Sequence, residues 1–360
     1  MTTPPRVVAL YLPQFHPIPE NDAWWEPSFT EWTNVTKAKP LYRGHEQPNL
    51  PSELGFYDLR VAEVREKQAQ LARDYGVSAF CYYHYWFGNG KRLLERPFNE
   101  VLASGKPDFP FMLCWANQTW SGVWHGLSGR VLAEQTYPGK EDEAKHFATL
   151  LPAFKDPRYL RVDGKPVFMV YAPMEMPDTK AFTAHWRALA LEAGLPGMHF
   201  LAEHPNPHWD AQAHGFDAFV LKPSFMRRRS WVPWSQPWKK ISGKILDLRG
   251  MPSRFDYAKS MSYFLPQDTA PNAILCVLPN WDNTPRSGAR GVVLENATPE
   301  TFATALDRAL ANSKPQADGQ SMLFIKSWNE WGEGNHLEPN RKYGRRYLEV
   351  LRDRLGFKPD

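Results

Sequence analysis

The order of apolar and amphipathic segments predicts an α/β protein, a single (β/α)8 barrel that spans residues 1–360. Eight short runs rich in Val, Ile, Phe and Tyr have the length and composition of buried parallel strands. These runs are Val7–Leu12, Val77–Tyr83, Phe111–Trp115, Val167–Tyr171, His199–Ala202, Ala218–Leu221, Ile274–Leu278 and Met322–Ile325. Longer amphipathic segments lie between them, and this alternation is typical of a barrel with outer helices.

Five segments carry the pattern of amphipathic helices. They are Leu59–Tyr75, Glu141–Phe154, Thr179–Ala193, Pro299–Ala311 and Arg341–Leu355. Thr298-Pro299-Glu300 predicts a helix N-terminus, because Thr can cap the helix and Pro suits its first position. A doubly wound sheet is the alternative fold, but no G-x-G-x-x-G follows the first strand, where a nucleotide-binding fold needs it.

Two connections are longer than ordinary loops. Pro13–Gly55 follows the first strand, and Pro223–Asn272 follows the sixth. Both are dense in Pro, Trp and polar residues, so we predict ordered active-site loops rather than linkers. The sequence shows no internal repeat, low-complexity tract or domain-splitting linker. We therefore expect one domain.

Composition narrows the classes of function. The formal net charge of +4 is too small for a chain of this length to indicate nucleic-acid binding. The basic stretch Arg227–Lys244 is local, so a solvated loop, an anionic sugar or a lipid phosphate all remain open for it. The 15 Trp, 14 Tyr and 21 Phe suit either a large aromatic core or a groove in which sugar rings stack on indole faces.

The sequence also bears on compartment, membrane and metal. Cys81, Cys114 and Cys276 lie in apolar runs, which favours buried free thiols in a reducing compartment. No signal peptide or membrane-spanning run is visible, so we expect a cytoplasmic protein without an integral membrane segment, or a periplasmic one if a signal was removed. Five histidines lack the spacing of metal ligands, and we expect neither a metal nor a cofactor. They are His16, His84, His125, His204 and His336.

Aromatic residues stand beside amides and acids at the C-terminal end of nearly every predicted strand. In a (β/α)8 barrel these ends form the active site. Indole faces cover sugar carbons, and amides and carboxylates bind sugar hydroxyls, so this composition predicts a carbohydrate site. The residues expected to bind substrate are Tyr11, Gln14, His16, Glu31, Trp32, Asn34, His84, Tyr85, Trp115, Asn117, Gln118, Glu203, Lys222, Trp281, Asp282, Trp328, Asn329 and Trp331.

Glu330 and Glu333 are the predicted catalytic pair. They follow the last strand within Trp328–Gly334 and would face one cavity if the backbone between them makes a single turn. Glycosidic cleavage needs two carboxyl groups, one that protonates the leaving oxygen and one that acts as base or nucleophile. The alternative is that Glu330 caps a helix and Glu333 forms a salt bridge.

Four segments together resemble the WbsX-like family. They are Ala9–His16, Glu31–Val35, Pro279–Arg286 and Trp328–Gly334. Members of that family are often labelled glycosyltransferases of lipopolysaccharide or capsule biosynthesis, and they are similar to glycoside hydrolase family 99. The match runs from about residue 6 to 355.

The resemblance implies a (β/α)8 barrel that acts on α-mannosides with retention. It makes Glu330 the base that deprotonates the sugar 2-hydroxyl and Glu333 the general acid, with a 1,2-anhydro intermediate. That chemistry requires O2 trans to the leaving group, as in α-mannosides and α-L-rhamnosides. Residues 223–270 do not map onto the hydrolases, so the substrate cannot be copied from family 99.

Three functions follow as hypotheses. The first is a retaining glycoside hydrolase or transglycosidase that acts on a bacterial surface polysaccharide or oligosaccharide. The second is a glycosyltransferase of O-antigen or capsule assembly, although the sequence has no DxD-type metal–diphosphate motif. The third is a non-catalytic glycan-binding barrel. The sequence predicts neither the sugar nor the oligomeric state.

Overall fold

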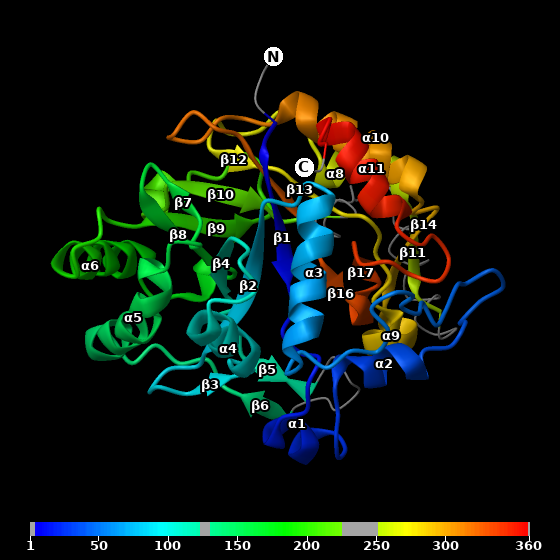
Figure 1. The fold of residues 1–360 in the computed structure, drawn as a ribbon, viewed down its shortest axis with the longest axis horizontal. Coiled ribbons are helices and arrows are strands. Elements are labelled where there is room, and N and C mark those ends of the chain that lie inside the picture. The colour runs from blue at the N-terminus through cyan, green and yellow to red at the C-terminus, as the bar shows by residue number, and fades with distance from the viewer. Residues whose placement is uncertain (1–3, 123–129, 225–250, 359–360) are drawn as a thin grey trace, which may run out of the picture.

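Parallel strands form a barrel in the computed structural model, which describes residues 4–122, 130–224 and 251–358 (Figure 1). Their order around the sheet is β12-β10-β9-β8-β4-β2-β1-β15-β13. The bounds are β1 Arg6–Tyr11, β2 Ala79–Trp86, β4 Phe111–Trp115, β8 Lys165–Val170, β9 His199–His204, β10 Ala218–Leu221, β12 Ala273–Ile274, β13 Cys276–Val277 and β15 Met322–Ile325.

The seventh predicted strand closes the barrel in two pieces. Ala273–Ile274 pairs with β10, and Cys276–Val277 pairs with β15. Leu275 lies between the pieces and accepts a backbone hydrogen bond from Phe324. All eight predicted runs therefore contain barrel strands, and the predicted (β/α)8 class is confirmed.

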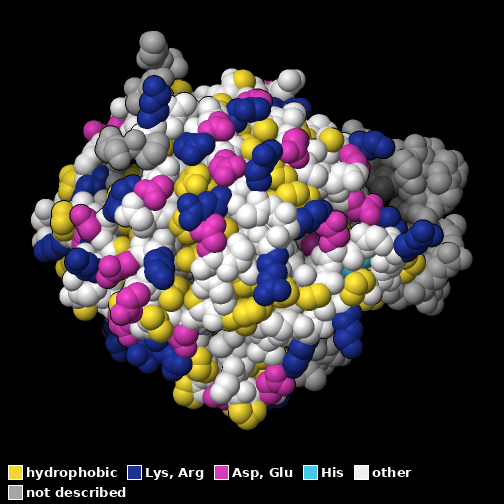
Figure 2. All heavy atoms as spheres, turned by 45° about the vertical axis from the view of Figure 1, so that its right-hand side comes forward, with side chains coloured by type: hydrophobic (Ala, Val, Ile, Leu, Met, Phe, Trp, Pro, Cys, Tyr) yellow, Lys and Arg dark blue, Asp and Glu magenta, His cyan; other side chains and the backbone are white. Residues whose placement is uncertain are grey.

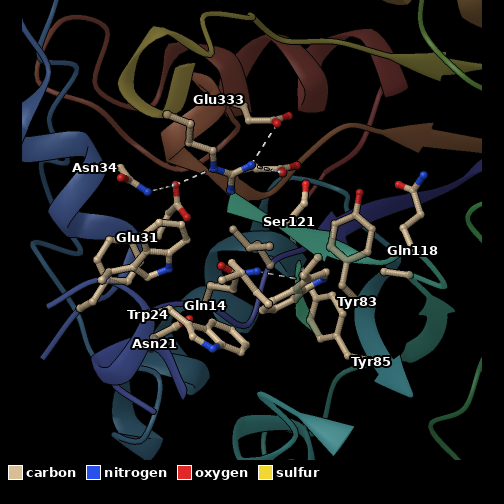
Figure 3. A pocket seen from close by; sticks show the side chains of 18 of the residues that line it. Gln14, Asn21, Trp24, Glu31, Asn34, Tyr83, Tyr85, Gln118, Ser121 and Glu333 are labelled. Atoms are coloured by element: carbon tan, nitrogen blue, oxygen red, sulfur yellow. Dashed lines mark hydrogen bonds and ion pairs between the residues drawn. The ribbon is translucent and has the colours of Figure 1, made fainter. Parts of the chain in front are cut away.

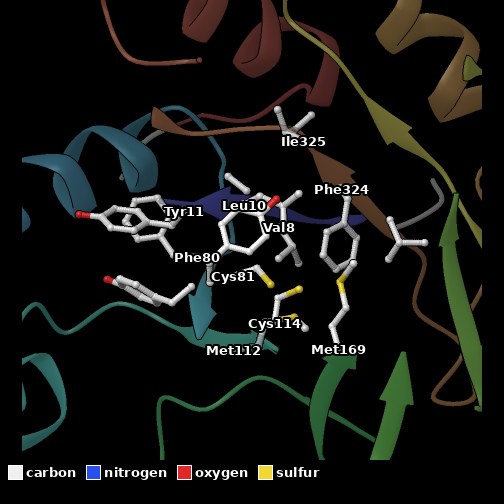
Figure 4. Close-up of a cluster of buried hydrophobic side chains, with 14 of the residues drawn as sticks. Val8, Leu10, Tyr11, Phe80, Cys81, Met112, Cys114, Met169, Phe324 and Ile325 are labelled. Carbon is white, nitrogen blue, oxygen red and sulfur yellow. The ribbon is translucent and has the colours of Figure 1, made fainter. Parts of the chain in front are cut away.

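Alternation along the strands divides the residues between the barrel interior and the helix-facing side. Val8, Leu10, Met169 and Phe324 are among the buried side chains that pack around the sulfurs in the core (Figure 4). The three cysteines are buried and free, as predicted. The core is apolar up to the C-terminal edge of the strands, where polar side chains replace it.

Helices cover the outside of the barrel (Figure 1). Their bounds are α3 Ala62–Asp74, α4 Arg96–Ser104, α5 Lys140–Lys155, α6 Thr179–Glu192, α8 Tyr257–Phe264, α10 Pro299–Asn312 and α11 Arg346–Leu355. The predicted cap at Thr298 is confirmed, because its hydroxyl accepts from the backbone nitrogen of Thr301 at 3.3 Å. The described connection between β9 and β10 contains the 3-10 turn Gln212–His214 in place of an α-helix.

Segments that extend from the barrel lie on the lower side of Figure 1, beyond the C-terminal ends of the strands. They include α1 Pro19–Trp24, α2 Glu31–Lys37, α9 Thr284–Ser287 and the hairpin of β5 Trp120–Ser121 with β6 Val131–Ala133. The predicted long loop Pro13–Gly55 is ordered and contains α1 and α2. Within Pro223–Asn272, β11 Ser253–Asp256 pairs with β14 Val292–Glu295. The basic stretch Arg227–Lys244 lies outside the described residues.

The described surface fits the nearly balanced charge of the chain. Acidic and basic side chains are interspersed on the face shown in Figure 2. Within the ranges that the structure describes, no helix combines the length and the apolar character needed to cross a membrane.

Candidate active site

A cavity of about 250 Å³ opens at the C-terminal edge of the barrel (Figure 3). Side chains from the loop after β1, from β2 and from the segments after β4, β8, β13 and β15 line it. The cavity therefore lies where active sites of this fold are found. Both predicted catalytic residues, Glu330 and Glu333, are part of its wall.

One tight turn presents the two glutamates. The short strands β16 Asn329–Glu330 and β17 Asn335–His336 flank the 3-10 turn Trp331–Glu333. Asn329 fixes this turn to β1, because its side chain accepts from the Leu12 nitrogen at 2.7 Å and donates to the Leu12 oxygen at 3.0 Å. The predicted single turn between Glu330 and Glu333 is thus present.

Arg286 joins the two glutamates to a third. Its Nη1 lies 3.1 Å from Glu330 Oε1 and 2.9 Å from Glu333 Oε1, while its Nε lies 2.8 Å from Glu31 Oε1. Glu31 and Glu333 accordingly point toward the same space from opposite sides in Figure 3. Within this group, carboxylates outnumber the guanidinium three to one.

This arrangement changes the proton affinity of Glu330. Burial raises its pKa, repulsion from Glu333 raises it further, and Arg286 and Lys326 oppose both effects, leaving a pKa of about 7. Burial alone would lower the pKa of Arg286, but Glu31, Glu333 and Glu330 raise it well above its ordinary value. Glu330 can therefore exchange a proton near neutral pH, as a catalytic acid or base must.

The inner part of the cavity contains a second ionic group. Lys326, at the end of β15, lines the cavity, and its Nζ lies 3.6 Å from Oε1 of Glu203 on β9. Lys222, after β10, approaches the other oxygen of Glu203 at 3.3 Å. Tyr171 also lines the cavity, and the Lys222 ammonium lies 4.0 Å from the centre of its ring.

Aromatic side chains form another wall. Trp24, Trp25 and Phe29 come from α1 and the residues after it, and Trp120 comes from β5. Trp24 and Trp120 meet with ring centroids 6.0 Å apart. Indole rings in a cavity wall suit the apolar faces of sugar rings. Together with Tyr83, Arg286 and Lys326, they were not among the predicted site residues, although Trp24-Trp25 in a long loop was a usable signal.

Five of the predicted substrate-binding residues line this cavity. They are Gln14, Glu31, Asn34, Tyr85 and Gln118. Gln14 donates to the Tyr85 hydroxyl at 3.4 Å, which connects the loop after β1 with β2. Their contact with a substrate remains a prediction.

Three predicted residues lie on the helix-facing side of the strands instead. The Tyr11 hydroxyl donates to Gln68 of α3 at 2.6 Å, and His84 Nε2 lies 2.8 Å from His146 Nε2 of α5. Trp115 packs against α5 and α6 and donates from Nε1 to the Trp86 oxygen at 3.0 Å. Alternation explains the difference, because neighbours one position away, such as Leu12, Tyr85 and Ala116, face the cavity.

Six other predicted residues are buried in the supporting structure and do not line the cavity. They are His16, Trp32, Asn117, Trp328, Asn329 and Trp331. Trp331 stacks on His336 with centroids 3.7 Å apart, and Trp328 packs on Phe80. Asn117 accepts from the Ala172 nitrogen at 2.8 Å and so fixes the loop after β8. Trp32 likewise donates from Nε1 to the Tyr57 oxygen at 2.8 Å, so Trp32, Asn117 and Asn329 each fix a backbone segment through a buried polar group.

The last four predicted residues lie beside the cavity rather than in its wall. Glu203 and Lys222 belong to the inner ionic group described above. Trp281 and Asp282 line a separate cavity of about 560 Å³. Asp282 is held there by His45 Nε2 at 2.8 Å and by Gln47 at 2.6 Å.

The fold and the site together define a class of protein. A (β/α)8 barrel with adjacent glutamates in an aromatic-walled cavity has the architecture of carbohydrate-active enzymes. Residues 7–351 match the model of a family described as Glycosyltransferase WbsX, and the chain belongs to that family. The family resemblance predicted from the sequence is therefore confirmed.

Curated relatives agree with this placement. The uncharacterized protein WxcX of Xanthomonas campestris pv. campestris is 38% identical over 362 residues. The match covers all of this chain but 51% of that relative, so the chain spans about half the length of the curated relatives it matches.

Two solved structures share the fold. A glycoside hydrolase-like protein has a TM-score of 0.58 at 13% identity, with 99% of this chain and 95% of that chain covered. The family 99 endo-α-mannosidase of Bacteroides thetaiotaomicron, solved with Bis-Tris propane, has a TM-score of 0.56 at 14% identity, with 99% and 97% covered. At these identities the likeness establishes the barrel fold alone.

Proposed function

We propose that this chain is a retaining glycoside hydrolase or transglycosidase that cleaves 1,2-trans α-glycosides, such as α-mannosides or α-L-rhamnosides, in a bacterial surface polysaccharide or oligosaccharide. The observation that carries the proposal is the placement of Glu330 and Glu333 on one guanidinium nitrogen of Arg286. Two oxygens within about 3 Å of one atom lie closer together than the roughly 6.5–9.5 Å that separates the carboxyl groups of inverting enzymes. The geometry therefore favours retention.

Glu330 is the base and Glu333 the acid in this proposal. A carboxylate with a pKa of about 7 is a stronger base than an ordinary one, so Glu330 suits removal of a proton from a sugar hydroxyl. Glu333 lies closer to solvent, with a side chain 18% exposed against 9% for Glu330, and would protonate the departing oxygen. The sugar 2-oxygen then displaces the leaving group, and water or a second sugar opens the resulting 1,2-anhydro ring.

A glycosyltransferase of O-antigen or capsule assembly is the second candidate, and the family description favours it. In that reaction a diphosphate leaving group would lie beside the reacting carbon. Around the two candidate catalytic carboxyl groups, three carboxylates share one guanidinium, that of Arg286. Such surroundings disfavour a diphosphate, which is why we rank the hydrolase first.

Aryl α-mannosides and α-L-rhamnosides with good leaving groups, offered without nucleotide sugar, test the proposal. We expect the parent protein to release phenol and Glu330→Gln to release none. Glu333→Gln should retain activity on the activated aryl groups only, because these need little protonation. Retention is read from the anomer formed first, by NMR. Turnover only with an added nucleotide sugar would favour the transferase.

A further inference from the structure

Two lysines share one carboxylate at the inner end of the cavity. Glu203 is the partner of both Lys222, at 3.3 Å, and Lys326, at 3.6 Å. Both ammonium groups also lie near the ring of Tyr171, at 4.0 Å and 5.4 Å from its centre. Strands β8, β9 and β10, which supply or precede Tyr171, Glu203 and Lys222, are neighbours in the barrel wall. The group therefore has one positive charge more than Glu203 can balance.

Within the described part of the chain, Lys326 and Glu203 leave their side-chain hydrogen-bonding capacity unused. The Lys326 ammonium donates no hydrogen bond to any residue that the structure describes, although its side chain is only 7% exposed. The Glu203 carboxylate, whose side chain is 1% exposed, accepts none within the same set of residues. Buried polar groups ordinarily find partners. An ammonium in a cavity wall with free donors is a group that a ligand can engage.

Glu330 does not consume the surplus charge. Glu330 raises the pKa of Lys326 more than Glu333 does, yet burial and Glu333 raise the pKa of Glu330 itself to about 7, so at neutral pH it carries only part of a negative charge. Glu330 and Glu333 both form their ion pairs with Arg286. The positive charge of Lys326, which lines the cavity, is therefore not fully neutralised by the carboxylates around it.

We propose that Lys326, supported by Lys222, forms a subsite for the carboxylate of an acidic sugar, so that the substrate carries a uronic acid. The inference rests on the proposed function, since it names the substrate class of the same cavity. One surplus positive charge matches one carboxylate, whereas a phosphate monoester brings about 1.5–2 negative charges. The carboxylate would accept hydrogen bonds from the Lys326 ammonium and from the hydroxyl of Tyr171.

Calorimetric titration with a matched pair of sugars tests this subsite without requiring turnover. The probes are methyl α-mannopyranosiduronate and methyl α-mannopyranoside, which differ only in the carboxylate. We expect the acid to bind the parent protein about tenfold more tightly, as one charged hydrogen bond provides. Lys326→Met should abolish this preference, and Lys326→Arg should keep most of it.

Further variants guard against misfolding and nonspecific charge effects. Lys326→Met together with Glu203→Gln removes both charges and avoids a stranded carboxylate, so it replaces the single variant if that one does not fold. Lys342→Met is the matched control, because Lys342 pairs with Glu46 outside this cavity, and it should keep the full preference. Mannose 6-phosphate reports whether phosphate is the better anion.

The outcomes separate cleanly. Equal binding of the two methyl glycosides, binding of neither, or a preference for the phosphate would each overturn the uronate subsite. So would a preference that survives Lys326→Met with Glu203→Gln. Because the titration measures binding alone, none of these results bears on whether Glu330 and Glu333 cleave glycosides, which the aryl glycoside assay decides separately.

Discussion

Arg286 donates from Nε to Oε1 of Glu31 at 2.8 Å, and this contact joins the loop after β13 to the loop after β1. Gly332, in the turn between the two catalytic candidates, makes room for it. A Cβ at that position would lie 1.6 Å from Glu31 Oε1 and 3.0 Å from Arg286 Nε. Three segments distant in sequence therefore determine where Glu330 and Glu333 are held.

Replacing Arg286 with Met should destabilise the protein and remove most of its activity. The change leaves Glu31, Glu330 and Glu333 facing one another without a cation, and breaking a buried ion pair in this way costs about 3–5 kcal/mol. Urea unfolding and kcat/KM on an aryl glycoside measure the two effects. Adding Glu31→Gln should recover part of the stability but not the activity. Unfolding unchanged from the parent would show that Arg286 holds nothing in place.

The pH dependence of kcat/KM should report the Glu330 carboxyl group. As a base it acts only when deprotonated, so activity should rise with pH through a midpoint of about 7. If Glu330 were the acid, activity would instead fall through that midpoint. Glu333→Gln removes the negative charge that raises the pKa of Glu330, so with activated aryl glycosides the midpoint should move to lower pH. A midpoint near 4, unaffected by Glu333→Gln, would contradict this assignment.

Two tryptophans allow a paired test of where the substrate binds. Trp24 lines the cavity and is half-buried, whereas Trp115 is buried behind β4. Trp24→Ala should raise KM about tenfold with little change in unfolding, because stacking on one indole face is lost. Trp115→Ala should cost about 3–5 kcal/mol of stability, as large-to-small core changes do, with KM unchanged in the folded fraction. The reverse pattern would place the substrate elsewhere.

The same pair shows what the sequence could and could not predict. The composition of short segments and their order along the chain were sufficient to predict the strands, the cap at Thr298 and the turn that carries Glu330 and Glu333. Which side of a strand end faces the cavity depends on a shift of one residue, so Trp115 was predicted where Ala116 lies. Because aromatic residues occupy both sides of these strand ends, the sequence does not reveal which alternate residues face the cavity.

Contacts between distant loops were beyond sequence reasoning for a different reason. Arg286 stood in a recognised segment, but nothing local indicates that it meets Glu31, which lies 255 positions away. Lys326 continues an apolar strand and reaches across the barrel to Glu203. Such pairings form only when the barrel closes, and no local sequence pattern reveals them.

Glu338 predicts how stability depends on pH. It accepts hydrogen bonds from Tyr57, Gln68 and Trp331, yet burial raises its pKa to about 7 from an ordinary 4.5. Between these values the folded protein keeps a proton that the unfolded chain has released, so the contribution of Glu338 to stability is fully present below pH 4.5 and is lost as pH rises toward 7. The shift corresponds to at most about 3 kcal/mol.

Glu338→Gln cannot titrate, so the loss of stability between about pH 4.5 and pH 7, the window that the raised pKa of Glu338 defines, should be smaller than in the parent protein. Urea unfolding at a series of pH values measures it. Glu330 contributes with the same sign, because its folded pKa is also about 7, and Glu330→Gln combined with Glu338→Gln should flatten the dependence further. Glu66→Gln, on the exposed side of α3, is the matched control. A slope that Glu338→Gln leaves intact would mean that the buried carboxyl is already ionised at pH 5 in the folded protein.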